Sequence, residues 1–399
     1  MVFRIIAMLL SLFVLPGLMR GITGKSMALG TLLGILVITA SHVKTYRIIF
    51  TRTSVFYTVL VILIIGIINI SHSSIYSIGV LFIFLVFLFS CIFIAGSFEV
   101  LNSNVIDRHF YSLLLLLLVI SLIQIGSDFK FLQYSYFPKT LAFYSEPSHL
   151  IVGLAPLIMF SFLRCRNQGK MFIFVSLLFI GIFSPSVISL FMVIFVLPLW
   201  LGPNHKILRL IAFTPVIYFV FFAISQFGDA EYIFSRLDFS GNENLTVLTY
   251  LQGWEEIKRI LLSEHYLGVG IGNSTNWSVG TYGELIYKLL DDYKNREDLG
   301  FLAAKIIVEL GWAGLVLVVY LSSISIRSYF LIFKSSGFSK SEIAQSTGAE
   351  LFSHVSLACF ILELFVRGSG YITSGVFLFI LGNIIINKKQ VSFHEKKSI

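Results

Sequence analysis

Apolar runs of about twenty residues recur along the whole chain and alternate with short loops. Each run is long enough to cross the roughly 30 Å hydrocarbon core of a bilayer as a helix. The runs lack the alternating pattern of barrel strands, which is the other structure that satisfies its backbone in lipid. With 57% hydrophobic residues and a mean hydropathy of +0.90, the sequence predicts an all-α polytopic membrane protein.

The lengths of these runs predict about twelve transmembrane helices. The run over 171–201 is too long for one span, and Ser184-Pro185-Ser186 divides it into a tight helical hairpin. The first run begins like a cleavable signal, but no A-x-A-like site follows it, so we expect a retained span. The predicted spans lie near residues 3–18, 27–42, 54–71, 75–95, 110–126, 148–163, 171–184, 186–201, 208–227, 301–322, 349–366 and 371–387.

The basic residues of the short loops predict the orientation of the chain. Placing the N-terminus in the cytoplasm puts 17 of the 29 Lys and Arg residues on that side. Both termini are then cytoplasmic. The net charge of +8 follows from these loops, so it does not indicate a nucleic-acid partner.

One long polar segment, residues 228–300, interrupts the apolar pattern. It holds 12 of the 21 acidic residues and six of the 29 basic ones, which gives it a net charge of −6. It contains no cysteine, so no disulfide framework is expected there. We therefore divide the chain into a bundle of about nine spans at 1–227, this extracytoplasmic loop, and a region of about three spans and a cytoplasmic tail at 301–399.

The long segment is predicted to contain an amphipathic helix that lies on the bundle or at the lipid surface. Its apolar residues recur at helical spacing: Val247, Leu248, Leu251, Trp254, Ile257 and Leu261. Its opposite side carries Gln252, Glu255, Glu256 and Arg259, of which Glu255 and Arg259 are spaced for an ion pair. A second short helix is expected near 283–292.

Residues 145–149 are predicted to begin a helix at the outer end of the sixth span. Pro147 suits the first helical turn, and Ser145 or Glu146 can cap it. Glu146 and His149 stand three residues apart, where a carboxylate and an imidazole can do general acid–base chemistry. A capped helix start with an interfacial histidine is the simpler alternative.

The cations of the long segment are candidate phosphate ligands. Most are expected to form surface ion pairs, but arginine's planar fork suits phosphate oxygens, and we favour Arg236 and Arg259. Arg367 follows the eleventh span on the outer side, either as an anchor paired with Glu363 or as a headgroup ligand. The six cations of the segment are Arg236, Lys258, Arg259, Lys288, Lys294 and Arg296.

The glycines at 268, 270 and 272 precede Asn273 but lack the strand–helix context of a nucleotide-binding fold. They predict a simple turn or a backbone nest near an anionic headgroup. Lys305 and Glu309 stand one turn apart inside a span, as a functional group or a structural pair.

Neighbouring carboxylates at Asp229 and Glu231, and at Asp291 and Asp292, lack the strand-rich setting of metal-dependent sugar transferases, so no metal is expected. His265 is a possible base, but a lone histidine after a helix is usually a surface residue.

These features together resemble the bacterial O-antigen polymerases (Wzy), within the group that includes O-antigen ligases. The resemblance rests on E-P-S-H at a helix start, the S-P-S hairpin, and a late outer loop with a tryptophan-bearing helix that leads into G-V-G-I-G-N. It continues in N-R-E-D-L-G-F-L-A-A-K-I-I-V-E-L-G-W-A-G-L from Asn295 to Leu315. The layout covers most of the chain, while the motifs cover only 142–152, 248–273 and 295–315.

The resemblance implies that repeat units carried on undecaprenyl pyrophosphate are joined at the periplasmic face of the bacterial inner membrane, without a metal or other cofactor. Membrane lipids, a chain-length regulator and a flippase are the implied partners. We assign Glu146 or His149 to orient or deprotonate the acceptor hydroxyl, and the tryptophan-bearing helix to cover the site. The groups assigned to bind pyrophosphate or shape its pocket are Arg236, Lys258, Arg259, Arg367, Gly268, Gly270, Gly272 and Asn273.

Three other functions stay open. An O-antigen ligase would transfer finished polymer to the lipid A core, and such loops more often place a conspicuous histidine beside the glycine turn. A flippase for lipid-linked oligosaccharide would show charges deep in several spans and short loops throughout, whereas here one loop dominates. A non-catalytic assembly partner is the third.

Overall fold

The computed structural model describes residues 2–24, 27–42, 75–98, 103–127, 132, 134, 140–184, 186–201, 244–293, 296–335, 347–368 and 370–397. These residues form helices, and an isolated bridge joins Leu141 and Tyr144. The helices are α1 (Val2–Phe13), α2 (Leu15–Thr23), α3 (Ala28–His42), α5 (Ile75–Phe98), α6 (Ser103–Gly126), α7 (Pro147–Arg164), α8 (Asn167–Phe183), α9 (Val187–Leu201), α12 (Leu245–Leu262), the 3₁₀ turn η2 (Ser274–Asn276), α13 (Thr281–Leu290), α14 (Leu302–Ser335), α16 (Gly348–Phe365) and α17 (Ser374–Lys397).

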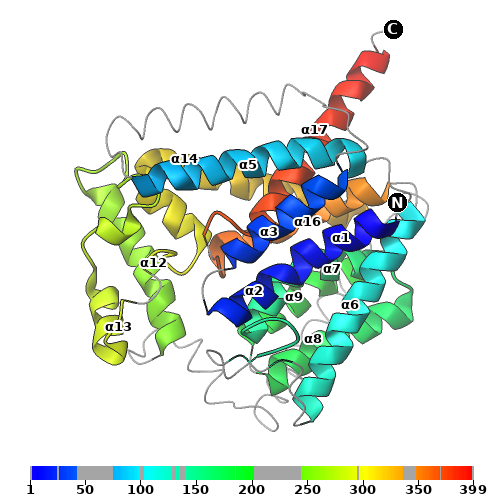
Figure 1. Ribbon diagram of the computed structural model, residues 1–399, viewed down its shortest axis with the longest axis horizontal. Helices are drawn as coiled ribbons and strands as arrows, with labels where there is room; N and C mark the ends of the chain where they lie inside the picture. The colour runs from blue at the N-terminus through cyan, green and yellow to red at the C-terminus, as the bar shows by residue number, and fades with distance from the viewer. Residues whose placement is uncertain are drawn as a thin grey trace.

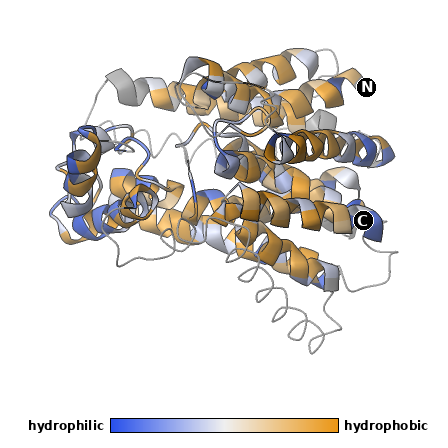
Figure 2. Cartoon of the chain, turned by 90° about the horizontal axis from the view of Figure 1, so that it is seen from below, coloured by the Kyte–Doolittle hydropathy of each residue, from blue (hydrophilic) through white to orange (hydrophobic). Residues whose placement is uncertain are grey.

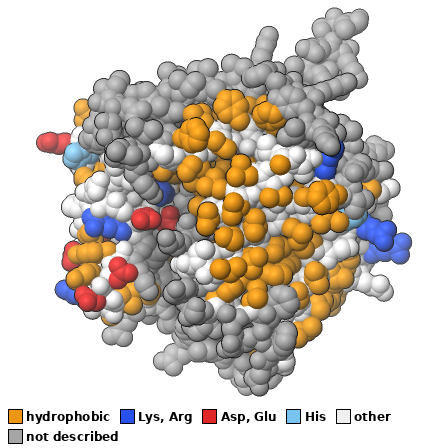
Figure 3. Space-filling view, in the orientation of Figure 1, with side chains coloured by type: hydrophobic (Ala, Val, Ile, Leu, Met, Phe, Trp, Pro, Cys, Tyr) orange, Lys and Arg blue, Asp and Glu red, His pale blue; other side chains and the backbone are white. Residues whose placement is uncertain are grey.

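The helix bundle is that of a multi-pass membrane protein. Four of the described helices, α6, α7, α14 and α16, are long and apolar enough to cross a membrane, and α1 with α2 makes a fifth if this pair, bent by 43°, is one span. Apolar side chains spread across the middle of the face in Figure 3, while charged side chains lie towards its edges. Helices occupy ten of the twelve predicted span segments, and the other two, 54–71 and 208–227, lie outside the described residues.

The predicted hairpin is confirmed, because α8 ends at Phe183 and α9 begins at Val187, and the two pack together. The Ser189 hydroxyl donates to the Leu177 carbonyl across this pair at 2.7 Å. The predicted span at 301–322 is too short, since α14 continues to Ser335. No proline or glycine follows Gly314 in this helix to stop it earlier.

Both ends of the described chain, near Val2 and the last turns of α17, lie at one end of the bundle. The polar helices α12 and α13 lie at the opposite end (Figure 1). Figure 2 shows the same division by hydropathy, with a mainly apolar bundle and hydrophilic segments gathered beside α12 and α13. Helix α16 packs against α7, α14 and α17, so its C-terminal end brings Glu363 into the interior of the bundle.

The break between α1 and α2 is explained by Pro16, which has no N–H to donate to the Leu12 carbonyl. The Ser374 hydroxyl donates to that carbonyl instead, at 2.7 Å, and the Tyr144 hydroxyl donates to the Phe13 carbonyl at 2.7 Å. Tyr144 fits there because a Cβ on Gly17 or Gly153 would lie 2.8 or 2.7 Å from its side chain. The contacts that Ser374 and Tyr144 make at this break therefore hold α2, α7, α17 and the segment before α7 together.

The glycine turn packs against a second break, inside α14 at Gly311 (φ 58°, ψ −136°). The break frees two helix carbonyls, and the turn supplies donors: the Val269 N–H donates to Val308 at 3.1 Å and the Gly270 N–H donates to Glu309 at 2.9 Å. The turn prediction is confirmed. The glycines at 268, 270 and 272 all have positive φ, which glycine adopts without steric cost.

The predicted apolar face of α12 is partly wrong. Trp254 is 43% exposed, whereas Gln252 and Glu256, predicted to face away from the bundle, are buried. The reason is that α12 contacts both α13 and α14, so the residues before α13 cover its polar side. The short helix predicted near 283–292 is present as α13.

Candidate functional site

An ion pair joins two of the residues singled out in the sequence. Nη2 of Arg367 donates to Oε2 of Glu146 at 2.8 Å, across 221 positions of the chain. Both side chains are partly exposed, at 28% and 37%. The alternative in which Arg367 pairs with Glu363 is wrong, since Glu363 accepts a hydrogen bond from Thr373 instead.

The helix at 145–149 begins where the sequence predicts, with Pro147 as its first residue. The proposed side-chain cap is wrong. Glu146 is the N-cap residue in an extended conformation, but it caps no backbone N–H, because its carboxylate is turned to Arg367 and the Ser148 hydroxyl.

His149 lies beside this ion pair and is buried. Its Nε2 is 3.5 Å from Nη1 of Arg20, and its Nδ1 is 3.3 Å from the Ser145 hydroxyl. Because a guanidinium can only donate, Nε2 is the acceptor, and Nδ1 carries the proton of the neutral ring. Arg20 also interacts electrostatically with Glu146 and Arg367, so four ionisable groups gather here.

A small cavity of about 30 Å³ lies next to this group, between α2, α3, α7, α16 and the start of α17. His149 and Arg367 line it together with Glu363, and hydroxyl groups from Thr31, Thr373 and Ser374 complete its polar lining. The volume is that of about one water molecule or one hydroxyl group. The cavity reaches from the half-buried Arg367 to the buried Glu363.

Lys305 and Glu309 form a second charged group at the same end of the bundle. Nζ of Lys305 lies 3.6 Å from Asp298 and 3.8 Å from Glu309, and it donates to the Glu297 carbonyl. The Tyr371 hydroxyl donates to Oε2 of Glu309 at 2.6 Å.

This second group holds three segments at the edge of the site. Asp298 ends the long polar segment, Glu309 also accepts from the Gly272 N–H of the glycine turn, and Tyr371 belongs to the connection that carries Arg367. Asp298 further acts electrostatically on Arg20. The contacts of Lys305 and Glu309 are therefore those of a structural pair. This pair lies next to the Glu146–Arg367 group.

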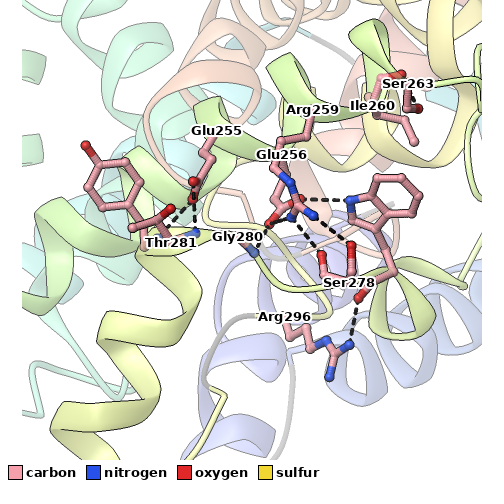
Figure 4. Close-up of polar contacts among 11 residues, drawn as sticks. Glu255, Glu256, Arg259, Ile260, Ser263, Ser278, Gly280, Thr281 and Arg296 are labelled. Carbon is pink, nitrogen blue, oxygen red and sulfur yellow. Dashed lines mark hydrogen bonds and ion pairs between the residues drawn. The ribbon is translucent and has the colours of Figure 1, made fainter.

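A third set of contacts clasps α12 to α13 (Figure 4). The Thr281 and Tyr282 N–H groups donate to the Glu255 carboxylate at 2.9 Å, which places a negative charge at the start of α13. Glu256 accepts from the Gly280 N–H and from the Trp277 indole, each at 2.9 Å.

Arg259 belongs to this clasp. The predicted Glu255–Arg259 pair is wrong, because Arg259 pairs with Glu256 at 2.8 Å and donates to Ser278 through both Nη atoms. Burial raises the pKa of Glu256, and Arg259 opposes that shift. The donors of Arg259 that could bind pyrophosphate thus already contact protein oxygens.

We expect Glu256→Ala to destabilise the clasp by roughly 3 kcal/mol, because it removes the carboxylate that pairs with Arg259 and accepts from two N–H donors. The loss is measured as faster trypsin cleavage within 244–293 and a lower thermal midpoint of the purified protein. Glu264→Ala, at an exposed glutamate just after the same helix, is the matched control. Equal cleavage of the two variants contradicts the clasp.

The remaining predicted ligands fall in different places. Arg236 lies outside the described residues, as do Asp229 and Glu231, and Lys258 is exposed on α12. The N–H groups of Gly268, Gly270, Gly272 and Asn273 all donate to protein acceptors. These four amides therefore do not form a nest that is open to a headgroup. Whether these residues shape the substrate pocket stays a prediction.

His265 is exposed and its ring packs edge-on against Trp277 at 5.3 Å. Asp291 and Asp292 are also exposed, at the end of α13. In the ranges that the structure describes, no three His, Cys, Asp or Glu side chains are grouped as metal ligands.

Sequence reasoning missed Arg20 and the place of Glu363. Arg20 is the one charged residue of α2, inside an otherwise apolar stretch, and an ionisable group in such a stretch is a signal of function. Glu363 was considered only as a partner for Arg367. Its true neighbours, Thr373 and Gly375, follow a helix connection that the local pattern does not place.

Comparison of the chain with protein-family models, with curated proteins and with solved structures finds no match.

Proposed function

We propose that this protein is an O-antigen polymerase that joins undecaprenyl-pyrophosphate-linked repeat units at the periplasmic face of the bacterial inner membrane. The observation that carries the proposal is the group formed by Glu146, His149 and Arg367, in which the helix start at 145–149 and the distant Arg367, two separate candidates from the sequence, share one site. The site lies near the end of the polar segment, since Arg20 interacts electrostatically with Asp298 as well as with Glu146 and Arg367.

The reaction transfers the growing chain from its lipid carrier to the new lipid-linked unit, and pyrophosphate leaves. A leaving group of this kind needs cations to stabilise its charge more than it needs a general acid. Arg367 is partly exposed and Arg20 is close enough to interact with it electrostatically, so the two guanidinium groups offer the forked donors that phosphate oxygens take. Glu146 or His149 orients or deprotonates the acceptor hydroxyl.

The proposal includes about twelve spans, two cytoplasmic termini and an extracytoplasmic segment at 228–300. Its partners are the lipid-linked donor and acceptor, membrane lipids, a chain-length regulator and a flippase, and it uses no metal. Arg236 remains a proposed pyrophosphate ligand. Glu255 and Glu256 hold the start of α13 against α12.

Deletion of the gene tests the proposal in cells. We expect surface glycan with single repeat units on the lipid A core and no long-chain ladder on a gel, restored by the wild-type gene. Glu146→Ala and Arg236→Ala, at equal protein levels in the membrane, should leave the short form.

Two other phenotypes would contradict a polymerase. Loss of all glycan transfer to the lipid A core indicates a ligase, and repeat units held on the inner leaflet indicate a flippase. A protease that cannot reach 228–300 from outside intact spheroplasts would remove the proposed location of the site.

A further inference from the structure

Glu363 is a buried carboxylate that the assignments above leave unused. It lies on α16, is 7% exposed, and lines the small cavity together with His149 and Arg367. Its hydrogen-bond donors are the Thr373 hydroxyl, at 2.7 Å, and the Gly375 N–H. Both donors are neutral, and among the described residues no cation forms an ion pair with it. A carboxylate has about four lone-pair directions, so two hydrogen bonds leave acceptor capacity.

The other two acceptors at the site face cations directly. The Glu146 carboxylate is paired with Arg367 at 2.8 Å and also accepts from Ser148. The Nε2 lone pair of His149 points at Arg20. A group that accepts a proton must have a free lone pair within hydrogen-bond reach of that proton, directly or through one water. Glu363 meets this requirement better than Glu146 or His149.

We propose that Glu363 is the general base of the reaction, an inference that rests on the proposed polymerase function. The acceptor hydroxyl of the sugar attacks the anomeric carbon of the donor and forms the new C–O bond. The bond from that carbon to the pyrophosphate oxygen breaks, and its electron pair leaves with the pyrophosphate. The hydroxyl proton goes to Glu363. In this arrangement Glu146 is a positioning residue that holds Arg367.

The cavity defines how the proton reaches Glu363. At about 30 Å³ it admits one hydroxyl group or one water molecule and excludes a sugar ring. The sugar therefore stays on the side of Arg367, and one hydroxyl or one bridging water enters between His149 and Glu363. The threonine and serine hydroxyls of the lining supply neutral partners for that group.

The test uses the full-length protein in proteoliposomes, with lipid-linked repeat units extracted from a strain that lacks this gene. Glu363→Gln is expected to lower kcat at least about 100-fold, with little change in KM for the lipid-linked units. Glu350→Gln is the matched control, because it makes the same change in the first turn of the same helix, α16, and Glu350 does not line the cavity. It should retain kcat within about fivefold of the wild type.

Each outcome decides one question. Wild-type kcat in Glu363→Gln, while Arg367→Ala is inactive, excludes Glu363 as the base and leaves the polymerase proposal standing. Equal losses in Glu363→Gln and Glu350→Gln show that the loss of activity follows from a weakened α16 and not from the removal of a base. No polymer from the wild-type protein, with the substrate shown to be intact, removes the polymerase function itself.

Discussion

Arg367→Ala is expected to abolish long-chain polymer and leave single repeat units. Arg367 is a partly exposed cation of the site, and in the proposed reaction its loss removes a fork of donors from the leaving pyrophosphate. Loss of one such donor group typically lowers kcat by roughly 100- to 1,000-fold. The substitution also leaves the Glu146 carboxylate, which the wild-type protein pairs at 2.8 Å, without its cation. The measurement is kcat in proteoliposomes, with the glycan ladder in cells beside it.

Two further variants separate charge from geometry at Arg367. Lysine keeps the charge but loses the fork, so Arg367→Lys should recover only part of the activity. Lys334→Ala, at an exposed cation near the end of α14, is the control for a lost positive charge. If Glu146→Gln and Arg367→Ala together cost no less than the sum of the single changes, the two residues do not act as a pair.

Gly311→Ala is expected to reduce the amount of folded protein in the membrane more than any other single change considered. At φ 58° and ψ −136° an alanine is strained, and its Cβ would lie 2.1 Å from the Tyr266 carbonyl oxygen. Strain and steric overlap together cost about 4 kcal/mol, which is a large part of the stability of a typical domain. The glycine turn would lose its place on α14, and with it the hydrogen bond from Gly272 to Glu309.

The effect of Gly311→Ala is read from protein levels in membranes and from the thermal midpoint in detergent. Gly79→Ala is the matched control: it lies within helix α5, and a Cβ there meets nothing within 4 Å. Alanine is favoured over glycine in a helix by up to about 1 kcal/mol, so this control should be neutral or stabilising. Similar midpoints for the two variants contradict the account of the break in α14.

Local sequence patterns were sufficient for most of the described helices. Long apolar runs became helices, Ser184 and Ser186 separate α8 from α9, and Pro147 begins α7, because each depends on backbone chemistry within a few residues. The glycine turn followed from glycine's freedom at positive φ. Periodicity also placed α12, although it assigned Glu256 to the wrong environment, since burial depends on what packs against a helix and not on its own spacing.

The tertiary structure decided which carboxylate each of two arginines pairs with. Helical spacing suggested that Arg367 pairs with Glu363 and Arg259 with Glu255, and in both cases a different carboxylate takes the arginine. The packing of helices that are distant in the sequence sets which charges meet. The start of α7 lies at the connection after α16, and the segment before α13 covers α12. The sequence by itself determined a helical membrane bundle with a polar segment. Only its packing brought Arg20, which no local pattern connects to His149, into the site.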